Sequence, residues 1–172
     1  MRQRARTGFT TLLVTLAAVA AAAPARAAPG GVATVSATIV KPLTLSWVQN
    51  LDLGTIVLGN GTWSGATVGI SRSEVFSCTN VNVTCSGATK VATYNVSGTN
   101  NQVVRITAPN VTLVNQSDPT KTLTLVVDGP GTLTLTNSGS PGVNFSLGGS
   151  ISLSSTTAGG VYAGTFNVTV DY

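Results

Sequence analysis

Histidine is absent from all 172 residues of the sequence. This absence excludes Ser-His-Asp and Cys-His catalysis and histidine-ligated metal sites, and it removes the commonest general base near neutral pH. The acidic residues are few and scattered, so a pair such as Asp52 and Asp128 would act together only if folding joined them. The sequence also lacks a phosphate-binding glycine loop, a dinucleotide fingerprint and a calcium loop. We therefore expect no enzymatic activity, no cofactor and no metal site.

Charge is also scarce, because Asp, Glu, Lys and Arg make up only 8% of the sequence. Four of the nine basic residues precede residue 28, and after that point the basic and acidic side chains are equal in number. A neutral chain with isolated charges offers no basic patch to a phosphate backbone or an anionic lipid surface. We therefore expect no nucleic-acid partner and no binding to acidic lipid.

The first residues have the pattern of a signal peptide. Three arginines precede an apolar run over residues 9–23, and Ala25-Arg26-Ala27 supplies a small-x-small cleavage pattern. A transmembrane anchor is the weaker interpretation, because the run is shorter than the roughly 20 residues that a bilayer requires. We expect a signal peptide over residues 1–27, a single domain over residues 28–172, and no membrane span after the signal is removed.

Only two cysteines are present, Cys78 and Cys85. In an exported protein they are expected to form a disulfide, which would close a short loop and stabilise one hairpin by roughly 2.5 kcal/mol. A redox or metal-binding pair is the weaker alternative, because the spacing is not that of a CxxC motif and no further ligand is near.

After the leader, the sequence has no long run of helix-forming residues, and short alternating segments are separated by turn residues. This pattern predicts an all-β fold, an antiparallel sandwich of two sheets. A bend at Gly54 is expected to interrupt a partly apolar stretch over residues 51–61. The expected strands are 32–40, 43–47, 66–70, 74–78, 90–97, 103–108, 110–114, 123–127, 132–136, 143–147, 150–153 and 166–172.

The last expected strand has the most regular alternation. Its apolar positions, Phe166, Val168, Val170 and Tyr172, alternate with polar ones, which places the two sets on opposite faces. Tyr162 and a group of glycines precede it and supply a turn. We expect this segment to be a core strand with its apolar face buried.

The few aromatic residues have two interpretations. Trp47, Trp63, Tyr94 and Tyr162 could form a platform that stacks on sugars. The simpler interpretation places Trp47 and Tyr94 in the core and Trp63 in a turn, because the chain has few large side chains to fill its interior.

Three segments carry a resemblance to a known family: ATIVKPLTL, LDLGTIVLG and the closing GGVYAGTFNVTVDY. They resemble the secreted bacterial proteins grouped as domain of unknown function 4402, and the closing pattern is similar to the end of spore coat protein U-like domains. Those domains include subunits of archaic chaperone-usher pili. The resemblance implies an immunoglobulin-like β-sandwich, complete or lacking one strand, and a location in the periplasm, at the cell surface or outside a bacterium. The partners it implies are identical subunits, or a periplasmic chaperone and an usher.

In such pili, a strand from the next subunit completes each sandwich by β-strand addition. Val32, Val35, Ala37 and Ile39 lie in an uncharged segment that would suit this donor role. Burying its apolar side chains would contribute roughly 5 to 8 kcal/mol before ordering costs. The same segment could instead be the first strand of its own domain, and periodicity does not separate the two. We therefore expect a structural subunit of a fibre or coat, with a monomeric surface binding module for glycans as the alternative.

Overall fold

The computed structural model describes residues 30–172, and the expected signal peptide lies outside them. The described part is all-β, as expected, and contains thirteen strands with only antiparallel pairing. No helix within these residues is long and apolar enough to cross a membrane. The strands are β1 (Thr44–Gln49), β2 (Thr55–Leu58), β3 (Ala66–Ile70), β4 (Phe76–Ser77), β5 (Val83–Ser86), β6 (Ala92–Ser97), β7 (Val103–Thr107), β8 (Val111–Asn115), β9 (Thr122–Asp128), β10 (Thr132–Thr134), β11 (Val143–Leu153), β12 (Tyr162–Ala163) and β13 (Thr169–Asp171).

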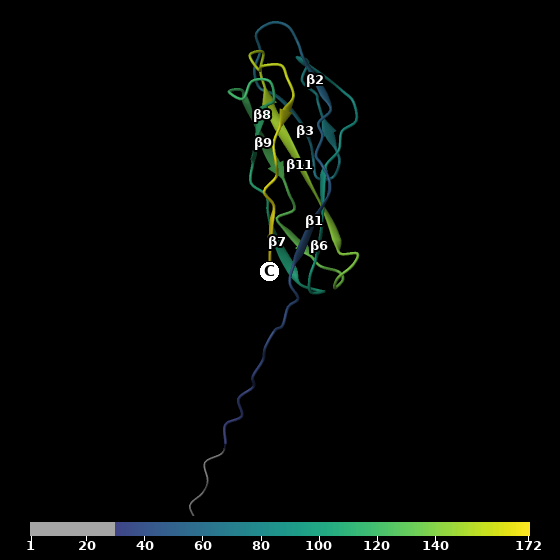
Figure 1. Cartoon of the computed structure of the whole chain (residues 1–172), viewed down its shortest axis with the longest axis vertical. Helices are drawn as coiled ribbons and strands as arrows, with labels where there is room; N and C mark the ends of the chain where they lie inside the picture. Colours follow the sequence, from purple (N-terminus) through teal and green to yellow (C-terminus); the bar gives the residue numbers. More distant parts are fainter. Residues whose placement is uncertain (1–29) are drawn as a thin grey trace, which may run out of the picture. The chain divides into compact units, whose positions relative to one another are not determined.

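The strands form one large sheet and two small ones. The large sheet has the order β1-β6-β11-β9-β8-β12, and β3 joins β11 with β4 beyond it. The small sheets are β10-β7-β13 and β2-β5. In Figure 1, β1, β6 and β7 lie near one end of the sandwich, while β2, β3, β8 and β9 lie toward the other.

The longest strand, β11, connects the two ends of the sandwich. Its first half, Val143–Leu147, pairs with β6, and its second half pairs with β3 and β9. The changeover occurs at Gly148, where an added Cβ would collide with the backbone of residues 70–72. Two strands were expected here, over residues 143–147 and 150–153. The two glycines between them prove to be part of one strand, and Gly148 allows this close approach.

Two apolar clusters fill the space between the sheets. One joins the large sheet to β2 and β5, with Val68, Leu125 and Ile151 on one side and Val83 on the other. The second joins β6 and β11 to the β10-β7-β13 sheet. Leu51, Val127 and Phe166 pack against both clusters, so the core is continuous along β11. This arrangement of facing antiparallel sheets is the expected β-sandwich.

Most expected strands occur within two or three residues of their predicted bounds, but there are further differences. Residues 32–40 form no strand. Strand β5 was not expected, because its four residues are too few for a clear alternation. The closing strand is shorter than residues 166–172, since only Thr169–Asp171 pair with β7, and a separate strand, β12, pairs with β8.

Candidate functional site

The most unusual feature of the sandwich is the edge at β1. Leu45 and Trp47 lie opposite Val96 and Tyr94 in the ladder with β6, and Tyr94 lies opposite Phe145 of β11. Directly opposite residues in an antiparallel pair share a face of the sheet. Val96 and Phe145 belong to the buried core, so Leu45 and Trp47 are also on the core-facing side. They are nevertheless 37% and 62% exposed.

The exposure of Trp47 corrects the expectation that it would be a core residue. Its indole N–H donates to Asn50 Oδ1 at 3.0 Å, beside a bulge at Val48, and its ring remains open to solvent. Tyr94 fits the expectation better: it is half-buried, its ring stacks on Phe145 at 5.7 Å, and burial raises the pKa of its hydroxyl. The difference arises because β1 is the last strand of its sheet, and no described strand pairs with its outer edge.

The facing sheet ends in an equally free edge, which belongs to residues 164–172. Phe166, Val168 and Val170 are half-buried and pack against the core, as their alternation predicted. Strand β13 pairs with β7 on one side only. Within the described residues, the backbone of residues 164–168 makes no hydrogen bond at all. The main chain here is therefore able to accept another strand.

Tyr172 differs from the other apolar positions of this segment. It was expected on the buried face, but it is 45% exposed. Its hydroxyl donates to the backbone carbonyl of Lys41 at 2.6 Å and accepts from the backbone N–H of Thr99 at 2.8 Å. Lys41 lies just before β1, so this contact holds the free edge of residues 164–172 beside the start of β1. Figure 1 shows the end of the chain next to β1 and β7. We call the two free edges, β1 and residues 164–172, the open edge.

The expected donor segment forms no strand in the described structure. Residues 32–40 pair with no strand in the described structure. Val35 and Ile39 are 96% and 89% exposed, and Val32 and Ala37 are exposed as well.

The other aromatic residues do not form a platform. Trp63 is half-buried and packs against the apolar cluster that joins the large sheet to β2 and β5. Its indole N–H donates to the carbonyl of Gly59 at 3.0 Å. Tyr162 donates its hydroxyl to the carbonyl of Ala158 at 2.8 Å. Only Trp47 and Tyr94 are neighbours, through the β1-β6 ladder. The four-residue sugar platform, the weaker of the two interpretations, is therefore not assembled.

The acidic residues named as a possible pair have separate structural roles. Asp52 accepts a hydrogen bond from the backbone N–H of Gly54 at 2.8 Å, and Asp128 accepts one from the backbone N–H of Arg72 at 2.8 Å. No group of three or more metal-binding side chains occurs within residues 30–172. Two shallow hollows, of about 310 and 270 Å³, contain one carboxylate between them, that of Glu74.

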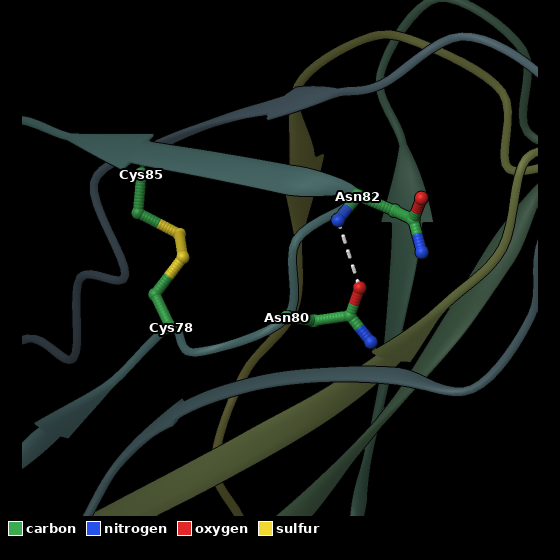
Figure 2. The surroundings of a disulfide bond; sticks show 4 residues. All are labelled: Cys78, Asn80, Asn82 and Cys85. Carbon is green, nitrogen blue, oxygen red and sulfur yellow. Dashed lines mark hydrogen bonds between the residues drawn. A yellow bond between two sulfur atoms is a disulfide. The ribbon is translucent and has the colours of Figure 1, made fainter.

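The expected disulfide is present between Cys78 and Cys85, whose Cα atoms are 6.3 Å apart (Figure 2). It does not close a hairpin. Cys78 follows β4, which pairs with β3 in the large sheet, whereas Cys85 lies in β5, which pairs with β2. The bond therefore ties the two sheets together. In the loop between them, the backbone N–H of Asn82 donates to Asn80 Oδ1 at 2.9 Å. A structural disulfide is compatible with an oxidising compartment outside the cytoplasm.

Comparison with known proteins gives one match. A family model described as "Domain of unknown function (DUF4402)" matches residues 43–172. The match starts one residue before β1 and includes both strands of the open edge, but it does not include residues 32–40. Searches of curated proteins and of solved structures returned no match. Because the family model covers most of the chain, the protein belongs to the DUF4402 family.

Proposed function

We propose that this protein is an exported structural subunit of a surface fibre or coat, assembled by β-strand addition, and that it is not an enzyme. The observation that carries the proposal is the open edge. Core-facing Leu45 and Trp47 are exposed, and the main chain of residues 164–168 makes no hydrogen bond within the described residues. An added strand would cover the apolar side chains and satisfy the free backbone groups in one step.

The occupant that fits this edge is a segment like residues 32–40. It carries no charge, it contains no proline, and its odd-numbered positions from Ala33 to Ile39 are all apolar. It has nine residues, the same number as residues 164–172. An identical subunit would supply the segment in the assembled state, while a periplasmic chaperone and an usher would protect the edge before assembly.

The apolar pattern of the segment gives a matched test of this proposal. The parent protein and two variants, Val35→Asp and Ser36→Asp, are purified and compared by size-exclusion chromatography over a range of concentrations. We expect oligomers that grow with concentration for the parent and for Ser36→Asp, because residue 36 lies on the polar face of the segment. Val35→Asp would bury a charge and should remain monomeric. A parent protein that stays monomeric at every concentration and melts cooperatively would overturn the proposal.

One observation favours a second candidate, a monomeric binding module for glycans. Trp47 exposes its ring to solvent, and aromatic rings stack on the apolar faces of sugars. Its core-facing position argues instead that an added strand covers it. A glycan screen with the parent and Trp47→Ala separates the two: sugars bound by the parent and lost in the variant would support the binding module, and identical profiles would remove it.

A further inference from the structure

Three residues at one end of the open edge form a closed ring of hydrogen bonds. The backbone N–H of Lys41 donates to Thr99 Oγ1 at 2.6 Å, and the backbone N–H of Thr99 donates to Tyr172 Oη at 2.8 Å. The Tyr172 hydroxyl completes the ring by donating to the Lys41 carbonyl at 2.6 Å. Gly98 makes room for it, because a Cβ at residue 98 would contact the Tyr172 hydroxyl and Leu43. We call this set the Lys41–Thr99–Tyr172 ring.

The ring engages the backbone N–H and carbonyl of Lys41, which a reversal of the chain at this point would also use. Only three residues, Lys41 to Leu43, separate the 32–40 segment from β1. To lie along its own open edge, the segment would have to reverse direction there, in a turn centred on Pro42 and Leu43. Such a turn uses the carbonyl of its first residue, Lys41, as the acceptor of its closing hydrogen bond. In the ring, that carbonyl already accepts from Tyr172, and the Lys41 N–H is also engaged.

The connection to β1 fixes the direction in which the chain's own segment could lie along the open edge. Tyr172 lies beside Lys41, and Phe166 lies where the two clusters join, as does Leu51 beyond β1. The 164–172 segment is therefore antiparallel to β1. A segment folded back from Pro42 would be antiparallel to β1 and parallel to residues 164–172. The segment of another molecule is not bound by this connection and can take either direction.

We propose that the Lys41–Thr99–Tyr172 ring keeps the open edge free of the chain's own 32–40 segment, so that the same segment of a second copy occupies it. This inference rests on the proposed function, since it assumes that the open edge accepts a strand. It assigns a role to Tyr172, the one apolar position of its segment that is held by hydrogen bonds at the surface. A subunit whose open edge is not filled by its own 32–40 segment can bind the same segment of a neighbouring subunit there.

The test measures how tightly the protein binds a labelled peptide with the sequence of residues 32–40. The purified protein is titrated by fluorescence anisotropy, at concentrations below those at which it self-associates. Tyr172→Phe opens the ring while keeping the aromatic body, and we expect it to bind the peptide about tenfold more weakly, because its own segment now competes. Tyr162→Phe is the matched control: it loses one hydroxyl bonded to Ala158, away from the ring, and should bind as the parent does.

A second variant shows whether competition is the cause. Adding Val35→Asp to Tyr172→Phe prevents the chain's own segment from entering the edge, so the parental affinity should return. Equal binding by Tyr172→Phe and the parent would overturn the ring's role, and so would weak binding that the double variant does not restore. Both results leave strand addition in place, because the parent still binds. A parent that neither binds the peptide nor self-associates would remove the proposed function together with this inference.

Discussion

At the scale of single residues, Asn115 has the most demanding position in the fold. It is the one fully buried polar side chain among the described residues. Its amide donates to the carbonyl of Gly159 at 3.0 Å, and its Oδ1 accepts from the backbone N–H groups of Ser117 and Asp118 at 2.9 and 3.2 Å. One side chain therefore anchors two loops, and its removal would break all three bonds at once.

We predict that Asn115→Ala lowers the free energy of unfolding by about 2 to 4 kcal/mol, because three hydrogen bonds are lost at a buried site. Urea unfolding followed by circular dichroism measures the change. Asn100→Ala is the control, since Asn100 is exposed and its side chain makes no hydrogen bond within the described residues; it should cost less than about 0.5 kcal/mol. Equal costs at the two positions would show that the Asn115 contacts contribute nothing.

Asp118 provides a prediction on pH at the same scale. The Thr120 hydroxyl donates to Asp118 Oδ1 at 2.7 Å, the Thr120 backbone N–H donates at 3.0 Å, and together with Lys121 they hold the pKa of this carboxyl below its ordinary value. A lowered pKa means that ionised Asp118 favours the folded state above the unfolded pKa. This contribution is lost as the pH falls through the folded pKa.

Thr120→Val removes the largest of these causes, so we expect the pKa of Asp118 to rise toward its ordinary value. The stability of the variant should then depend less on pH in the acidic range. Carbon-13 NMR titration of the Asp118 carboxyl measures the pKa directly. Thr122→Val, in the exposed part of β9, should leave it unchanged. An Asp118 pKa that does not move in Thr120→Val would show that the hydroxyl has no influence.

At the scale of the elements, β11 depends on Gly148. We predict that Gly148→Ala lowers the free energy of unfolding by about 3 kcal/mol, because the added Cβ would collide with main-chain atoms of Ile70, Ser71 and Arg72, which cannot move aside as a flexible side chain can. Gly159→Ala is the control, since an added Cβ at residue 159 meets nothing within 4 Å. Denaturant unfolding compares the two, and similar stabilities would contradict the close packing at Gly148.

The elements also show which parts of the fold the sequence could predict. Strands such as β3 and β7 were predicted within a residue of their bounds, because alternation reports directly which face is buried. The continuity of β11 was missed, since Gly148 and Gly149 suggest a break when only local propensity is considered. Gly148 makes room for residues 70–72 and Gly149 for Leu125 and Val126, and both are tertiary contacts. The disulfide pairing was predicted, but its cross-sheet role depends on where β4 and β5 pair.

At the scale of the whole molecule, the open edge could be only partly predicted. The expected strand over residues 43–47 exists, and its Leu45 and Trp47 lie on the core-facing side. Whether a core-facing residue is covered depends on how far the opposite sheet extends, and no local pattern contains that information. In the same way, residues 32–40 have the periodicity of a strand but form none in the described structure. Their alternation predicts an apolar face suited to burial, but it does not predict which molecule would cover that face.

An edge made for a second chain should separate stability from assembly, and Trp47 tests this. We predict that Trp47→Thr lowers the free energy of unfolding of the isolated protein by about 1 kcal/mol or less, because its side chain is already exposed. Leu147→Ala, on the same core-facing side of the large sheet but fully buried, should cost about 2 to 5 kcal/mol. Denaturant unfolding of monomeric protein measures both.

Assembly should show the opposite order of effects. Trp47→Thr removes the largest apolar surface that an added strand would cover, so its affinity for the 32–40 peptide should fall at least tenfold although the protein stays folded. A Trp47→Thr variant that unfolds as easily as Leu147→Ala would mean that Trp47 is covered within the monomer. A stable Trp47→Thr variant with parental peptide affinity would mean that strands are added elsewhere. Only weak binding by a stable variant agrees with a sandwich whose core is completed by its neighbour.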